Sequence, residues 1–229
     1  MTWHAKRTGS YSPTSQNAID NATEAAAILI NDFGWTQAAC CGLFGNIDYE
    51  GVWNPWRWEG DNVKTRAQAQ TTSSGYGLIG WTPARKYQFN NATTSGGTAW
   101  FPNYDQENYP GYGPNWDDQT GLATDGAAQI RLIGEAMARS NPNIWIRRKP
   151  CTQHQFIALT TIDDAAYYWL WNAEYPASIG PGHDPTATED RRIRAARAWA
   201  TRLNWDIPTR GFPLPLIFKK IADRSRGFL

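Results

Sequence analysis

The feature that most constrains the fold of this 229-residue chain is a predominantly apolar helix that ends on an acid. Thr36 can cap the start of this helix, and its apolar pattern stops near Glu50, just before Asn54 and Pro55. Aromatic residues follow and would shield the Glu50 carboxyl from water. Partial burial disfavours the charged form and raises the pKa, so that a glutamate can deliver a proton near neutral pH. The apolar side of the helix carries Ala39, Leu43, Phe44 and Ile47.

Most of the remaining pattern is helical. Apolar residues at helical spacing predict a helix over 18–33, which Gly34 ends. In the second half of the chain, periodicity and capping signals predict helices over 125–139, 152–159, 163–174 and 186–203. Two of these helices open on the capping-box pairs Thr152 with Gln155 and Thr186 with Glu189.

The segment from Trp56 to Trp81 lacks a helical period. Its aromatic alternation and glycines predict a small, irregular β-hairpin or sheet that forms one wall of a cleft. A short helix is expected over 82–87, after Thr82 and Pro83. An ordered functional loop is expected over 90–124, because its aromatic residues can anchor it. The fold class is α+β and mostly α, and we expect one domain over 1–229, with a core of about 15–203 and a tail over 204–229.

Composition excludes several functions. The 22 Lys and Arg residues nearly balance the 21 Asp and Glu residues, so neither nucleic acid nor a membrane surface is expected as a partner. The N-terminus lacks a signal-peptide pattern. Three cysteines, two of them adjacent, are interpreted as reduced, buried thiols, and no metal or cofactor is implied.

Two residue types are expected at the surface. The arginines over 191–202 are predicted to form an exposed helix face. The 13 tryptophans are divided between the core and flat surfaces that could stack on sugars.

Two spaced motifs give the chain a resemblance to a known family. The helix exit reads Gly45-Asn46-Ile47, then Glu50, then Asn54-Pro55, and a second motif reads Gly75-Tyr76-Gly77-Leu78, then Trp81. Together they resemble the phage tail lysozymes, over roughly 15–203. One departure is Gly80, where family members often carry Gln.

The resemblance implies a lysozyme-like fold and hydrolysis of the β-1,4 bond between N-acetylmuramic acid and N-acetylglucosamine, with Glu50 in the place of the general acid. Glycoside cleavage generally uses a second carboxylate, and Glu59 and Asp61 are the candidates, although either could be a solvated turn residue. The expected sugar contacts are Tyr76, Trp81, Trp58 and Asn54.

Bacterial peptidoglycan is therefore the expected partner, together with other virion tail proteins, and the expected location is the phage tail or the cytoplasm of the infected host. Two alternatives stay open. The chain could be an inactive structural or wall-binding module on the same scaffold, as the Gly80 departure suggests. It could also cleave without water and leave 1,6-anhydro sugar ends.

Overall fold

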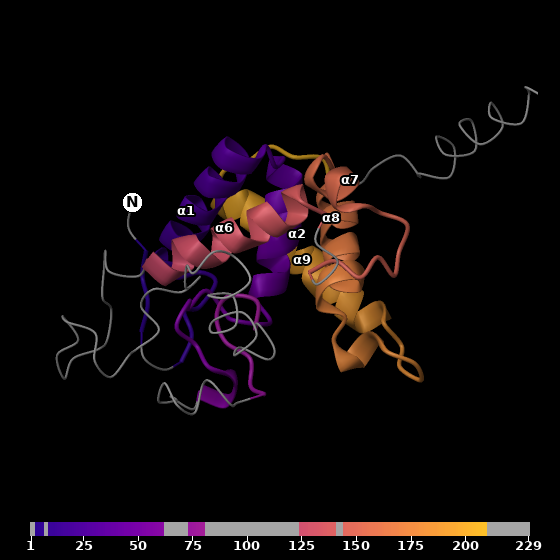
Figure 1. Ribbon diagram of the computed structural model, residues 1–229, viewed down its shortest axis with the longest axis horizontal. Helices are drawn as coiled ribbons and strands as arrows, with labels where there is room; N and C mark the ends of the chain where they lie inside the picture. Colours follow the sequence, from indigo (N-terminus) through magenta and orange to yellow (C-terminus); the bar gives the residue numbers. More distant parts are fainter. Residues whose placement is uncertain (1–2, 7–8, 62–72, 81–123, 141–143, 210–229) are drawn as a thin grey trace, which may run out of the picture.

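The computed structural model describes residues 3–6, 9–61, 73–80, 124–140 and 144–209, and this part of the chain is mostly helical (Figure 1). Its α-helices are α1 (Gln16–Phe33), α2 (Gln37–Ile47), α6 (Thr124–Ala138), α7 (Gln153–Ile157), α8 (Ile162–Trp169) and α9 (Thr186–Arg202). Short 3-10 turns occur at η1 (Glu59–Asp61) and η3 (Ala177–Ile179), and η2 (Leu170–Glu174) is a π-helical turn that continues α8. The mostly helical prediction is confirmed.

Helix α2 is the centre of the packing. It contacts α8 and α9, and also α1, which in turn packs on α6 (Figure 1). Nearly every residue of α2 is buried, as expected of a helix that is apolar all round. Its glycines allow the close approach: a Cβ atom on Gly42 would lie 2.5 Å from the backbone of Ala165, and one on Gly45 would lie 2.6 Å from the backbone of Ala196.

The local capping signals that the sequence predicted for three helix ends are confirmed. Thr36 accepts a hydrogen bond from the Ala39 amide at the start of α2. Gly34 ends α1 in the left-handed conformation, with φ of 69°. Thr152 and Gln155 form the capping box of α7, where each side chain bonds the backbone amide of the other residue.

The capping box predicted for α9 is wrong. Thr186 makes no side-chain cap, and its amide instead donates to the Asp184 carboxylate at 2.9 Å. The Glu189 side chain is used elsewhere, because it accepts a hydrogen bond from the Trp171 indole at 2.7 Å. A tertiary contact has therefore replaced the local one.

The arginines of α9 do not form one exposed face. Arg192 is 5% exposed, so the prediction is wrong for this residue. Arg197 and Arg202 are partly buried and pair with Asp163 and Asp48. Arginine can span the width of a helix interface and place its charge against a buried acceptor, which a pattern of charged letters does not reveal.

The predicted β-hairpin is not confirmed. In the described part of the 56–81 segment, the strand pairing consists of a single antiparallel bridge between Trp58 and Tyr76. Residues 62–72, the short helix predicted over 82–87 and nearly all of the loop predicted over 90–124 lie outside the described residues.

Buried groups complete the core. Cys40, Cys41 and Cys151 are free and buried, as predicted. Aromatic side chains occupy the space around α2, where Trp53 packs between Phe44 and Trp199 with ring centroids 5.0 and 4.7 Å away. None of the helices described combines the length and hydropathy needed to cross a bilayer.

Candidate active site

Glu50 lies on a tight turn at the end of α2. The amides of Tyr49 and Glu50 bond back to carbonyls of the last helical turn, and the chain then passes through left-handed conformations at Val52 and Trp53, with φ of 48° and 60°. Such conformations are uncommon for residues other than glycine and persist only where packing enforces them. The Trp53 indole is held by the Asp48 carboxylate at 2.8 Å, so the turn that presents Glu50 is fixed from the core side.

The structure brings together the two motifs that carried the family resemblance. The Gly51 amide donates to the Leu78 carbonyl at 2.9 Å, and the Gly77 amide donates to the Arg57 carbonyl at 2.9 Å. A Cβ atom on Gly51 would lie 2.2 Å from the Gly77 carbonyl oxygen, so only glycine fits there. The helix exit and the Gly75–Gly80 segment are therefore two sides of one unit.

The side chain of Gln129, on α6, ties this unit to the helices. Its carbonyl oxygen accepts the Leu78 amide at 2.7 Å, and its amide nitrogen donates to the Pro55 carbonyl at 2.7 Å. Gln129 is fully buried. One glutamine thus fixes both segments relative to each other.

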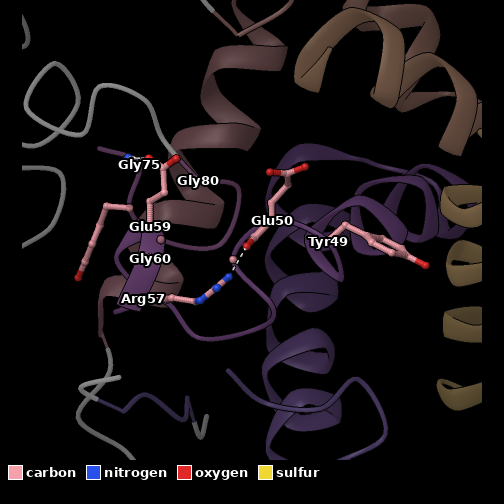
Figure 2. Close-up of a pocket in the computed structure, with 10 residues that line it drawn as sticks. Tyr49, Glu50, Arg57, Glu59, Gly60, Gly75 and Gly80 are labelled. Carbon is pink, nitrogen blue, oxygen red and sulfur yellow. Dashed lines mark hydrogen bonds between the residues drawn. The ribbon is translucent and has the colours of Figure 1, made fainter. Parts of the chain in front are cut away.

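A pocket of about 250 Å³ opens between these segments. Figure 2 shows Glu50 and Glu59 on opposite sides of it, with Arg57 reaching the Glu50 backbone carbonyl. The described residues that line it are Tyr49, Glu50, Gly51, Arg57, Glu59, Gly60, Gly75, Tyr76, Gly77 and Gly80. The charged side chains in this lining are those of Glu50, Glu59 and Arg57, and half of the lining residues are glycines.

The two carboxyl oxygens of Glu50 have different surroundings. Oε1 pairs with Nη2 of Arg192 at 2.6 Å, and the same guanidinium donates to the Asn46 carbonyl at 2.9 Å. Oε2 lies on the side of Gly80, where a Cβ atom would be 3.8 Å away. The Glu50 side chain is 26% exposed. One oxygen is therefore anchored in the protein, and the other is next to the pocket.

The pKa of Glu50 is raised above its usual value. Burial is the largest cause, since it disfavours the charged form, and the nearby negative charge of Glu59 adds to it. Arg192 and Arg57 act in the opposite direction without cancelling the rise. A raised pKa is what a carboxyl needs to act as a proton donor near neutral pH.

Glu174 is a second acid near Glu50, and sequence reasoning did not assign it a role. It ends η2 and accepts a hydrogen bond from the Trp169 indole at 2.9 Å. Burial raises its pKa, and the charge of Glu50 raises it further. Glu174 and Arg192 come from segments far from Glu50 in the sequence, and neither lies in a pattern that indicates the contact.

Of the two candidate partner carboxylates, Glu59 lines the pocket with Glu50 and Asp61 does not. The Glu59 carboxylate is held by the Gly75 amide at 2.9 Å. Asp61 faces away, because it pairs with Arg57 at 3.1 Å and accepts the Gly9 amide at 3.1 Å. The geometry therefore favours Glu59 over Asp61 as a group that could act with Glu50.

The expected sugar contacts differ in their placement. Tyr76 belongs to the pocket lining but is fully buried, and its ring lies tilted against that of Trp58, with centroids 4.7 Å apart. Trp58 is 1% exposed and offers no free face to a ligand. Asn54 is fully buried, and its side chain binds the backbone of Lys6, Gly9 and Trp56, which is a structural task. Trp81 lies outside the described residues.

Comparison with known proteins supplies the class of this molecule. The model of the phage tail lysozyme family matches residues 20–203, so the chain belongs to that family. A curated relative, Morphogenesis protein 1 of Bacillus phage B103, is 28% identical over 174 residues. The match covers 73% of this chain and 38% of the relative, so the chain spans well under half the length of that protein. The family is one of lysozyme-like phage proteins, and the predicted resemblance is confirmed.

Proposed function

We propose that this chain is a phage peptidoglycan hydrolase that cuts the β-1,4 bond between N-acetylmuramic acid and N-acetylglucosamine, with Glu50 as the general acid. The observation that carries the proposal is the half-buried Glu50 carboxyl, which has a raised pKa and one oxygen next to a pocket built from both family motifs. Membership of the phage tail lysozyme family supports the same substrate.

In this mechanism Oε2 of Glu50 carries the proton and gives it to the glycosidic oxygen as the bond breaks. Oε1 stays anchored by Arg192, so the carboxyl does not rotate away from the pocket. Glu59, across the pocket, stabilises the developing oxocarbenium ion or activates the water that attacks it. Tyr76 forms part of the pocket wall.

The role during infection is local penetration of the cell wall by a protein carried on the virion. Support comes from membership of the phage tail lysozyme family and from the relative, which is named Morphogenesis protein 1 and belongs to a Bacillus phage. Peptidoglycan would then be the substrate, and other tail proteins would be the partners.

Cleavage by the Glu50→Gln variant tests the assignment of the acid. Glutamine keeps the shape of the side chain but cannot donate a proton, so release of reducing ends from purified peptidoglycan should fall about a hundred- to ten-thousand-fold. Glu135→Gln is the matched control, because it makes the same change on α6 outside the pocket lining and should leave the rate within a few-fold of the unmodified chain. Unchanged cleavage by Glu50→Gln would remove Glu50 from the mechanism.

One observation favours the inactive structural or wall-binding module as a second candidate. Gly80 lines the pocket at the position where family members often carry Gln, so the pocket has no side-chain contact for the sugar there. As such a module, the unmodified chain would bind walls and release neither reducing ends nor 1,6-anhydro ends. Mass spectrometry of the products distinguishes hydrolysis, 1,6-anhydro formation and no cleavage.

A further inference from the structure

A row of cations lies over a row of aromatic rings, away from the pocket that holds Glu50. The guanidinium of Arg148 is 3.6 Å from the ring centroid of Tyr175, and Nζ of Lys149 is 4.0 Å from that of Trp171. Lys149 also lies 5.8 Å from the ring of Tyr167. The loop that carries the cations runs beside α8 (Figure 1). We call Arg147, Arg148 and Lys149, with these three rings, the cation–aromatic surface.

The three rings form a continuous row because of their spacing. Tyr167 and Trp171 are four positions apart on α8 and η2, and Tyr175, which follows η2, contacts Trp171. Their centroids are 6.3 and 5.8 Å apart, and all three side chains are half-buried. The Trp171 indole is further fixed by Glu189. The rings are therefore a firm base for the cations above them.

The loop is held in place from beneath by one buried residue. The backbone carbonyl of Asn172 accepts the Ile146 amide at 2.8 Å, and its side-chain oxygen accepts the Lys149 amide at 2.7 Å. Asn172 is fully buried within the π-helical turn. π-Helical turns occur frequently at functional sites, where they realign side chains.

Backbone strain is concentrated at the same place. Arg147 and Tyr175 both have left-handed conformations, with φ of 55° and 42°. Neither is a glycine, and such conformations cost about 1–3 kcal/mol each unless packing over-determines them. The backbone is therefore strained at one residue of the cation row, Arg147, and at one residue of the aromatic row, Tyr175.

The cations are presented to solvent without a neutralising partner. Arg147 and Arg148 are exposed and Lys149 is half-buried, and within the described ranges none of the three has a carboxylate in ion-pair range. Ile146, just before them, is 57% exposed. Stacking on aromatic rings limits the freedom of Arg148 and Lys149 before any ligand arrives, which lowers the ordering cost of binding an anion.

We propose that the cation–aromatic surface binds the carboxylates of the peptide stems on a peptidoglycan strand whose glycan lies in the Glu50 pocket. The ring row and Glu50 are linked through one turn of α9, because Trp171 bonds Glu189 and Arg192, three positions further along that helix, pairs with Glu50. The inference rests on the proposed function for the identity of the polymer. In this arrangement the cation–aromatic surface binds the acidic peptides, and the Glu50 pocket binds and cleaves the glycan.

Binding is measured in a Glu50→Gln background, so that cleavage does not alter the ligand. The probe is insoluble peptidoglycan stripped of teichoic acid, and the readout is the fraction of protein that co-sediments. Changing Arg147, Arg148 and Lys149 to Gln together should weaken binding about ten-fold, as expected for the loss of several exposed ion pairs. Salt should weaken binding by the parent protein and have little effect on the variant.

The matched control changes three other exposed arginines, Arg131, Arg139 and Arg194, to Gln, and therefore makes the same change in net charge. This control should bind as the parent does. Amidation of the wall carboxylates should reduce parental binding to the level of the variant. Equal binding by both triple variants, or binding that survives amidation, would overturn the proposal.

Two further arms identify other ligands and keep the two proposals separate. Binding to phosphatidylglycerol vesicles in preference to stripped peptidoglycan would assign the surface to anionic lipid and reject the proposal. Cleavage is assayed with Glu50 intact on peptidoglycan glycan strands freed of their peptide stems, where the triple variant should match the unmodified chain. If the unmodified chain does not cleave these strands but its wall binding behaves as expected, the proposed function alone is contradicted.

Discussion

Asp48 is a buried carboxylate that joins three parts of the chain. Its Oδ1 accepts hydrogen bonds from the indoles of both Trp53 and Trp199, at 2.8 and 2.9 Å. Arg202 lies 3.8 Å from the other oxygen, and the Asp48 side chain is only 7% exposed. Burial raises the pKa of Asp48 to about 6 in spite of these partners. The charge at this position therefore destabilises the native state near neutral pH.

Asp48→Asn should be more stable than the unmodified chain at pH 7. An amide oxygen can still accept from both indoles, while the buried charge is lost. Because the folded pKa is above the unfolded one, the penalty is complete above about pH 6 and absent below the usual value of 3.8. A shift of this size corresponds to about 3 kcal/mol as an upper bound. Urea unfolding at pH 7, 5.5 and 4 should show that the variant's gain in the free energy of unfolding becomes smaller as the pH falls. A variant that is less stable than the unmodified chain at pH 7 would contradict this account.

The pH dependence of cleavage should report the groups around Glu50. A general acid must be protonated, so the rate falls as pH rises through the pKa of Glu50, which burial places above its usual value. Glu59→Gln removes a like charge and should move this alkaline limb to lower pH. Arg192→Gln removes an opposite charge and should move it to higher pH. Glu135→Gln, outside the pocket lining, should leave the limb in place, and shifts of the same sign in the first two variants would be inconsistent with this charge arrangement.

What could be predicted at the level of single residues depended on distance along the chain. The partial burial of Glu50 could be predicted, because the helix that buries it and the turn that exposes it are adjacent in the sequence. Arg192 lies 142 positions from Glu50, and among neighbouring arginines it has no distinguishing pattern. Trp58 and Asn54 were expected to touch sugars, yet their burial depends on distant segments that the sequence does not place.

At the level of elements, the helices were predictable and the pocket lobe was not. Periodicity and caps are local signals, and they located α1, α2, α6 and α7 closely. The end of α8 changes to a π-helical turn, for which the sequence offers no signal. The segment around Trp58 and Tyr76 is held by turns, glycine contacts and Gln129 rather than by a strand ladder, so aromatic alternation led to a prediction of more sheet than the described residues contain.

Gln129→Ala tests whether one α6 side chain holds the lobe together. The change leaves the Leu78 amide and the Pro55 carbonyl without buried partners, and it opens a cavity beside Gly77. The free energy of unfolding should fall by about 2–4 kcal/mol. Hydrogen exchange should accelerate at Leu78 in particular, and KM should rise. Arg131→Ala, an exposed change on the same helix, is the control, and unchanged exchange at Leu78 would contradict this role.

At the scale of the whole molecule, the N-terminal residues connect the helices to the turn that carries Glu50. The described residues 3–6 and 9–11 form neither helix nor strand. The described part is firmly packed: Trp3 and Tyr11 are each 5% exposed. The His4 amide donates to the Asn21 side chain of α1, and the Asn21 amide group in turn donates to the Trp53 carbonyl. A short segment thus links α1 to the α2 exit.

Deleting residues 1–10 should therefore impair the active site as well as the fold. The deletion removes the Trp3 ring from Gly126 of α6, where a Cβ atom would lie 2.2 Å from that ring. It also removes two of the three backbone partners of the Asn54 side chain, Lys6 and Gly9. Loss of a buried tryptophan alone costs about 3–5 kcal/mol, so thermal unfolding should occur at a clearly lower temperature. The Trp3→Ala variant separates the two effects, because it opens the cavity and keeps the hydrogen bonds to Asn54. It should lower stability while cleavage at low temperature stays near normal, whereas the deletion should also reduce cleavage there. Equal low-temperature cleavage in both variants would show that the segment stabilises the core without holding the turn that presents Glu50.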